Sequence, residues 1–138
     1  MSTPGYVWRC AASDGLMNLD RCHFWLARFR DEESLESYFA EPDEYFDGEP
    51  INQFARDQNK TFYDHDFVFA EFDADGRLDH LCDRIQLPAE TRDELLKRAG
   101  NDYNAIIAGD QGEFDTPQDV EGDPMLTYVG CFPCFVQD

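Results

Sequence analysis

Alternating and clustered apolar residues predict four strands in this chain. The predicted strands cover residues 22–30, the end of 62–72, 104–108 and 125–136. In the first strand Phe24 and Leu26 are apolar, whereas Arg28 and Arg30 are charged, which predicts one buried face and one wet face. The last strand is expected to be broken at Pro133, because proline cannot donate a hydrogen bond to a β-ladder.

A helix is predicted where apolar residues recur three and four positions apart. Asp31 suits its N-cap, and Leu35, Tyr38 and Phe39 then fall on one face that points into the core. We expect Pro42 to end this helix, because the residue before a proline disfavours helical backbone.

Shorter helical segments are predicted further along the chain. One has Pro50 in its first turn and Phe54 facing inward. Two more are expected over residues 77–86 and 88–99. In the last one, Thr91 and Glu94 have capping-box spacing, and Gly100 is expected to stop the helix.

These elements predict an α+β fold with a mainly antiparallel sheet packed with three or four short helices. Consecutive strands are not all separated by a long helix, which disfavours a doubly wound parallel sheet. We expect residues 1–138 to form a single domain, with 1–21 as an N-terminal extension. Hydrophobic residues make up 42% and aromatic residues 14%, which is enough for a core despite a mean hydropathy of -0.61.

The net charge departs strongly from that of an average chain. Thirty acidic residues face eleven basic ones, which gives a net charge of -19 and a pI near 4.2. Such a chain repels nucleic acid and anionic membrane surfaces, and it attracts basic partners. The alternative is that the acidic surface serves solubility alone, as it does in salt-adapted proteins.

The cysteines and the first residues indicate a reducing, cytoplasmic location. Five cysteines form an odd and irregularly spaced set, and 1–15 lack the pattern of a secretion signal, so we expect no disulfide framework. No apolar run approaches the roughly 20 residues that span a bilayer. Cys131 and Cys134 form a CxxC pair without two further zinc ligands at a standard spacing. We favour buried structural thiols, and leave a redox or metal role for this pair open.

An acidic and aromatic stretch, residues 31–75, contains the candidate binding residues. It holds fifteen Asp and Glu against one Arg and one Lys, with tyrosines and phenylalanines interleaved. Carboxylates accept paired hydrogen bonds from arginine, and tyrosine provides contact area with little loss of entropy, so this composition suits a basic protein surface. The predicted contact residues are Glu41, Asp43, Glu44, Tyr45, Asp47, Asp64, Asp66, Glu71 and Asp73.

A second hypothesis concerns the segment Asp64, His65 and Asp66. A histidine between carboxylates is typical of metal sites and of acid–base pairs. In an extended segment, however, His65 points away from the two carboxylates, and no EF-hand spacing is present. We therefore predict no catalytic residue, no metal site and no cofactor, and we keep a small metal-dependent hydrolase as the alternative.

Several short motifs follow one another in an order that is typical of one known family. They are Phe24-Trp-Leu-Ala-Arg-Phe29, the acidic segment Arg30 to Phe39, Ile51 to Asp57, Tyr63-Asp-His-Asp-Phe67 with Glu71, Asn104-Ala-Ile-Ile107 and Tyr128-Val-Gly-Cys-Phe132. On these motifs, residues 22–135 resemble the immunity protein 22 family of bacterial polymorphic toxin systems. The CxxC pair is not part of that pattern.

The resemblance implies an immunity protein that protects the producing cell from a toxin, without catalysis and without a cofactor. The charge adds the expectation that the partner is a basic toxin domain, because a nuclease active site is built to hold phosphates. We expect no direct contact with nucleic acid or membrane, and either a monomer or a homodimer. An acidic nucleic-acid mimic unrelated to toxins is a further alternative.

Overall fold

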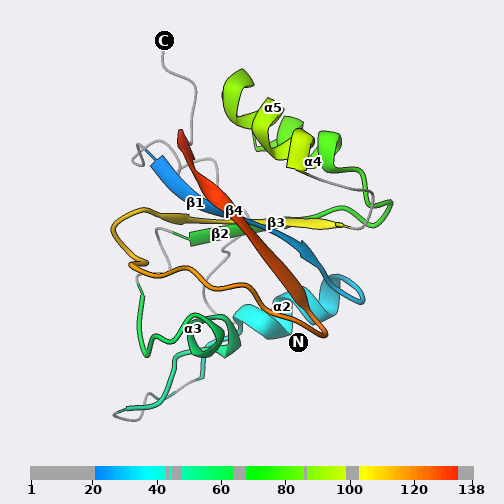
Figure 1. Ribbon diagram of the computed structural model, residues 1–138. Coiled ribbons are helices and arrows are strands. Elements are labelled where there is room, and N and C mark those ends of the chain that lie inside the picture. Colours follow the sequence, from blue (N-terminus) through cyan, green and yellow to red (C-terminus); the bar gives the residue numbers. More distant parts are fainter. Residues whose placement is uncertain are drawn as a thin grey trace.

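The computed structural model describes residues 21–42, 44, 48–63, 68–85, 87–98 and 103–133. Within these ranges four strands form one antiparallel sheet in the order β2-β3-β1-β4 (Figure 1). The strands are β1 (Arg21–Arg28), β2 (Val68–Phe72), β3 (Ala105–Asp110) and β4 (Met125–Pro133). This confirms the predicted α+β class with an antiparallel sheet.

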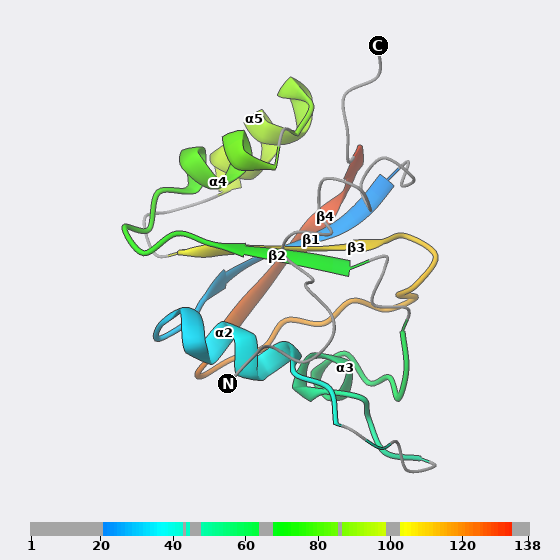
Figure 2. The ribbon, with the colours of Figure 1, turned by 180° about the vertical axis from the view of Figure 1, so that it is seen from behind.

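Helices cover both faces of the sheet (Figures 1 and 2). One face carries α2 (Glu32–Phe39) and α3 (Gln53–Asp57), and the other carries α4 (Leu78–Arg84) and α5 (Ala89–Arg98). The long connection 111–124 between β3 and β4 runs over the same face as α2 and α3 (Figure 1). The sheet is therefore the middle of three layers.

The strand β1 lies inside the sheet and is buried on both sides. Phe24 and Leu26 pack toward α4 and α5, and Trp25 and Ala27 pack toward α2 and α3; all four are fully buried. The prediction that one face of this strand is exposed to solvent is therefore wrong over residues 24–27. The exposed arginine Arg28 stands at the end of the strand, where the sheet finishes.

The helix α2 forms as the sequence predicted. The side chain of Asp31 accepts a hydrogen bond from the backbone N–H of Ser34 at 2.8 Å, which satisfies a free donor of the first turn. The helix ends at Phe39, three residues before Pro42. Its buried residues are the three predicted apolar ones: Leu35, Tyr38 and Phe39.

Two predicted helix starts are wrong. The cap of α3 is Asn52 rather than a turn begun by Pro50, and its side chain accepts from the N–H of Ala55 at 2.8 Å. Thr91 lies inside α5 and is fully buried, and its hydroxyl donates to the carbonyl of Pro133 at 2.7 Å. Thr91 therefore ties α5 to β4 and caps no helix.

The thiols differ from expectation at two positions. Cys22, fully buried in β1, is disulfide-bonded, a bond that was not foreseen when no disulfide framework was expected. Cys131, expected to be a buried thiol, is only partly buried. Cys82 and Cys131 are free, and burial raises the pKa of the Cys82 thiol to about 11. Cys134 lies outside the described residues. Across the described part of the chain, every helix is too short and too polar to cross a bilayer.

Aromatic side chains hold the connection 111–124 against the sheet. The ring of Phe114 lies 5.4 Å from that of Trp25 and 5.5 Å from those of Phe54 and Tyr63. These edge-on and tilted contacts are the geometries that aromatic pairs prefer. Phe114 also sits directly above Gly109, where a Cβ atom would come within 2.6 Å of the ring. The absence of a side chain at Gly109 thus makes room for this aromatic cluster.

We predict that Gly109→Ala destabilises the fold by about 1–3 kcal/mol, because the added methyl group overpacks the core against Phe114. The matched control is Gly112→Ala in the exposed turn, where the added methyl group would meet the end of the Asp110 side chain at 3.1 Å. This side chain can move into solvent, so the free energy of unfolding should change by less than about 0.5 kcal/mol. Urea unfolding measures both. The double variant Gly109→Ala, Phe114→Leu should lose less free energy of unfolding than the sum of the losses in the two single variants. Equal stability of the two alanine variants would contradict the packing argument.

Candidate functional site

The two helical layers differ sharply in charge. Segment 77–98, which forms α4 and α5, contains five Asp or Glu and five Arg or Lys. Each of those five basic side chains lies in an ion pair with a carboxylate. This layer is therefore electrically balanced and offers no strong field to a partner.

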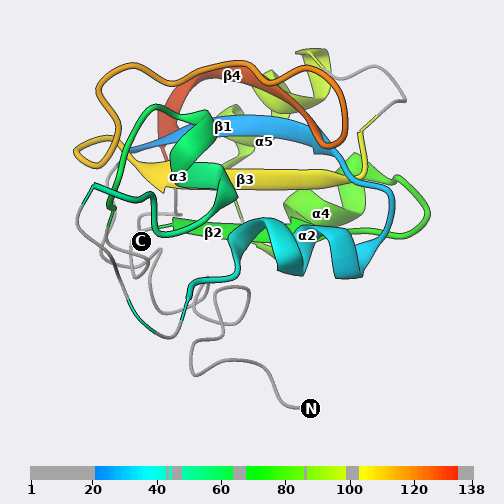
Figure 3. The same ribbon diagram turned by 90° about the horizontal axis from the view of Figure 1, so that it is seen from below.

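The opposite layer carries most of the net charge. Among its described residues, segments 30–63 and 111–124 hold thirteen Asp or Glu against three Arg or Lys. We call this surface, made by α2, α3, their connection and segment 111–124, the acidic face (Figure 3). An excess of this size attracts basic partners over several ångströms of water.

Two predicted site residues serve a different purpose. Glu71 lies in β2, and Asp73 comes directly after the strand. Guanidinium nitrogens of Arg84 in α4 lie 3.9 Å from the Glu71 carboxylate and 3.4 Å from the Asp73 carboxylate. The Asp73 carboxylate is buried and accepts from the N–H of Arg77 at 2.9 Å, at the entry to α4. Arg84 also donates to the carbonyl of Phe72 at 2.8 Å. These contacts fix α4 against the sheet, on the side away from the acidic face.

The remaining predicted residues lie in or near the connection between α2 and α3. Glu44 is exposed, and Glu41 is half-buried. The other predicted contacts lie outside the described residues: Asp43, Tyr45, Asp47, Asp64 and Asp66. His65, the centre of the hydrolase hypothesis, lies outside them as well. Within the described ranges, no three His, Cys, Asp or Glu side chains gather into a group that holds a metal.

A groove of about 340 Å³ crosses the acidic face between α2, the start of α3 and the hairpin 120–126. Its lining is mainly polar and comes from three separate parts of the chain. The lining residues are Arg30, Glu33, Ser34, Ser37, Tyr38, Gln53, Asp123 and Pro124.

The groove is charged at its rim and uncharged at its floor. At the rim, the lining residues Arg30 and Asp123 lie 3.3 Å apart, and Asp31, which does not itself line the groove, lies 4.0 Å from Arg30. All three side chains are more than half exposed. The backbone N–H of Ser34 holds the pKa of Asp31 below its usual range, so this carboxylate stays ionised. At the floor, Tyr38 is buried, and its hydroxyl donates to the carboxylate of Asp57 at 2.7 Å. Burial, followed by this hydrogen bond, raises the pKa of the hydroxyl far above its usual range, so it stays neutral.

The register of the sheet explains why the groove is missed in the sequence. Arg28 pairs with Met125 in the antiparallel ladder of β1 and β4. Two residues beyond this pair in each direction, Arg30 and Asp123 therefore stand opposite each other. The residues of each segment can be read from the sequence, but their proximity depends on a pairing of strands about 100 residues apart.

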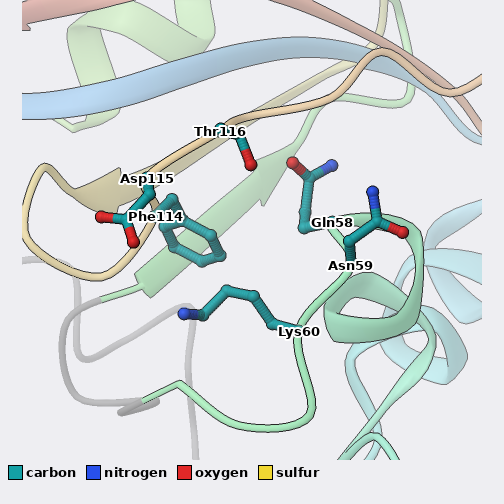
Figure 4. A pocket seen from close by; sticks show the side chains of 6 residues that line it. All are labelled: Gln58, Asn59, Lys60, Phe114, Asp115 and Thr116. Carbon is teal, nitrogen blue, oxygen red and sulfur yellow. The ribbon is translucent and has the colours of Figure 1, made fainter.

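A second, smaller cavity of about 140 Å³ lies where α3 ends (Figure 4). The amide of Gln58 at its back is bonded at both ends to the backbone of Gln118, at 3.0 and 2.6 Å. The ammonium of Lys60 stands 5.8 Å from the centre of the Phe114 ring. These groups already hold segment 111–124 in place, so this cavity serves packing and we do not treat it as a binding site.

Comparison with known proteins adds one finding. Residues 22–133 match the family model described as Immunity protein 22. No curated protein and no solved structure matches the chain. The matched range contains nearly all of the described fold, including the acidic face and its groove.

We predict that Asp73→Ala destabilises the protein by about 1–2 kcal/mol, because it removes the acceptor at the start of α4 and the partner of Arg84. The control is Asp75→Ala in the same turn, an exposed residue whose loss should cost less than about 0.5 kcal/mol. Chemical unfolding followed by circular dichroism compares them. Unfolding midpoints that coincide would show that Asp73 does not hold α4.

Proposed function

The chain belongs to the Immunity protein 22 family, and from this membership we propose that it binds a cognate bacterial toxin and neutralises it. The family suggests a toxin-neutralising role, and immunity proteins in general act without enzymatic activity. We accordingly propose a protein inhibitor without catalytic residues, cofactor or metal, which works in the cytoplasm of the producing cell. The partner is a toxin protein.

The acidic face is the proposed contact surface. The observation that carries this proposal is a contrast in charge among the described residues: thirteen acidic against three basic ones on that face, and an even balance over segment 77–98. A surface of this kind speeds encounter with a basic partner and disfavours wrong ones. We propose that the partner is a basic, nuclease-type toxin domain, whose phosphate-holding surface the carboxylates cover.

The contact residues predicted from the sequence have distinct proposed roles. Exposed Glu44 and its neighbours Glu41, Asp43, Tyr45 and Asp47 are proposed to contact the toxin, together with Asp64 and Asp66. Glu71 and Asp73 are proposed to contribute indirectly. Their carboxylates are held by α4, so they shape the protein rather than meet the partner.

The test is binding to the toxin-like domain encoded beside the gene for this chain, measured by calorimetry and by association kinetics at two salt concentrations. We predict tight one-to-one binding that weakens as salt rises. The triple variant Glu44→Gln, Glu49→Gln and Glu121→Gln should lower the association rate about tenfold at low salt, because all three are exposed on the acidic face.

The matched control removes the same charge from α5 and from the turn before α4. Asp75→Asn, Glu90→Gln and Asp93→Asn are also exposed, and this variant should bind within about twofold of the unchanged protein. An equal loss in both triple variants would assign the effect to net charge and refute the acidic face as the contact surface. Absence of binding at either salt concentration would refute the toxin partner itself.

A further inference from the structure

We propose that the groove between α2 and the hairpin 120–126 receives an arginine side chain of the toxin, in the place that Arg30 now occupies. This inference rests on the proposed function, since it takes the partner to be a basic toxin domain. It goes further by naming one binding position on the acidic face and the chemical group that binds there.

The first support is that the chain already holds a guanidinium at this position. Arg30 stands between the carboxylates of Asp31 and Asp123, at 4.0 and 3.3 Å. These carboxylates come from the cap of α2 and from the hairpin, which the pairing of Arg28 with Met125 brings together. Asp123 thus accepts a hydrogen bond from a guanidinium at the rim, and Asp31 adds a second negative charge nearby, which suits an arginine side chain.

The second support is that Arg30 is held weakly. Its side chain is 71% exposed, and its two partners are 54% and 58% exposed. Exposed ion pairs contribute little, because water and salt screen them and the long side chain loses entropy. A guanidinium from a docked partner, in contrast, would be shielded from water, so its bonds to the same carboxylates would be stronger. The exchange leaves no carboxylate unpaired.

The third support is the composition of the groove below the rim. Glu33 adds a carboxylate on the wall, with no counterpart of opposite sign among the lining residues except Arg30. Ser37 and Gln53 add oxygen atoms that can accept hydrogen bonds from the remaining N–H donors of an arginine. The groove of about 340 Å³ is open to solvent on the acidic face, where a toxin approaching that face would meet it.

The experiment compares two arginine variants that change the net charge by the same amount. Arg30→Ala removes the protein's own guanidinium from the groove, whereas Arg56→Ala removes an exposed arginine from α3 on the same face, outside the groove. Binding to the neighbouring toxin-like domain is measured by surface plasmon resonance. We expect Arg30→Ala to bind at least about fivefold more tightly than Arg56→Ala, through slower dissociation, because a competing internal cation is gone.

A second pair removes one carboxylate each from the same helix. Glu33→Gln changes the groove wall, and Glu36→Gln changes an exposed residue of α2 that does not line the groove. We expect Glu33→Gln to speed dissociation about tenfold and Glu36→Gln by less than about twofold. Circular dichroism and thermal unfolding confirm that all four variants remain folded.

The outcomes separate this inference from the function on which it rests. If the unchanged protein binds the toxin domain but the two members of each pair bind it with equal affinity and dissociation rate, the groove does not bind an arginine of the toxin, and the proposed function stands. If Arg30→Ala binds more weakly than Arg56→Ala, Arg30 itself contacts the toxin and the exchange is refuted. If the unchanged protein does not bind the toxin domain at all, the proposed function fails, and the proposed arginine-binding groove is refuted with it.

Discussion

The burial of β1 on both faces is the constraint on which the rest of the structure depends. Trp25 occupies the side facing α2 and α3, and polar atoms at this point need partners inside the protein. The indole N–H of Trp25 donates to the carbonyl of Gln118 at 3.0 Å, and the ring of His23 lies 2.9 Å from the carbonyl of Phe114. Because a carbonyl can only accept, Nε2 of His23 donates to it, and in a neutral ring Nδ1 then accepts from the Tyr128 hydroxyl at 2.8 Å. Segment 111–124 is therefore fastened to the central strand.

This fastening explains how a strongly acidic connection keeps a defined shape. Segment 111–124 contains five acidic residues and no basic one, so charge repulsion alone would favour an expanded chain. Beneath its carboxylates, Phe114 enters the aromatic cluster, and Val120 pairs with Leu126 through two backbone hydrogen bonds. The acidic side chains stay at the surface while their backbone is anchored in the core. The negative charges of the acidic face thus lie at fixed positions, and a folded partner can place its positive charges opposite them.

The sequence predicted the elements that depend on neighbouring residues and missed those that depend on distant ones. The cap at Asp31 and the apolar face of α2 follow from spacing within a single helix, and the structure confirms both. Thr91 had capping-box spacing, but its hydroxyl bonds to Pro133 across the fold, a contact that no local pattern encodes. The same limit applies to the site. The acidity of residues 31–75 was evident, yet the pairing of Arg84 with Asp73, which removes that carboxylate from the surface, required the packing of α4 on β2.

The separation of a broad acidic face from one shaped groove matches two different needs of an inhibitor. A diffuse excess of carboxylates accelerates encounter but discriminates poorly, since any basic protein responds to it. Discrimination requires a site whose polar groups are satisfied by one arrangement of the partner and left unpaired by others. At the groove rim, Asp31 and Asp123 are already matched to a guanidinium, and Arg30 keeps them paired in the free protein. An incoming arginine then replaces one cation by another and also meets the carboxylate of Glu33 on the groove wall, whereas a partner without it leaves Arg30 in place and gains neither contact. The groove thus adds selectivity to a face whose charge alone would favour any basic partner.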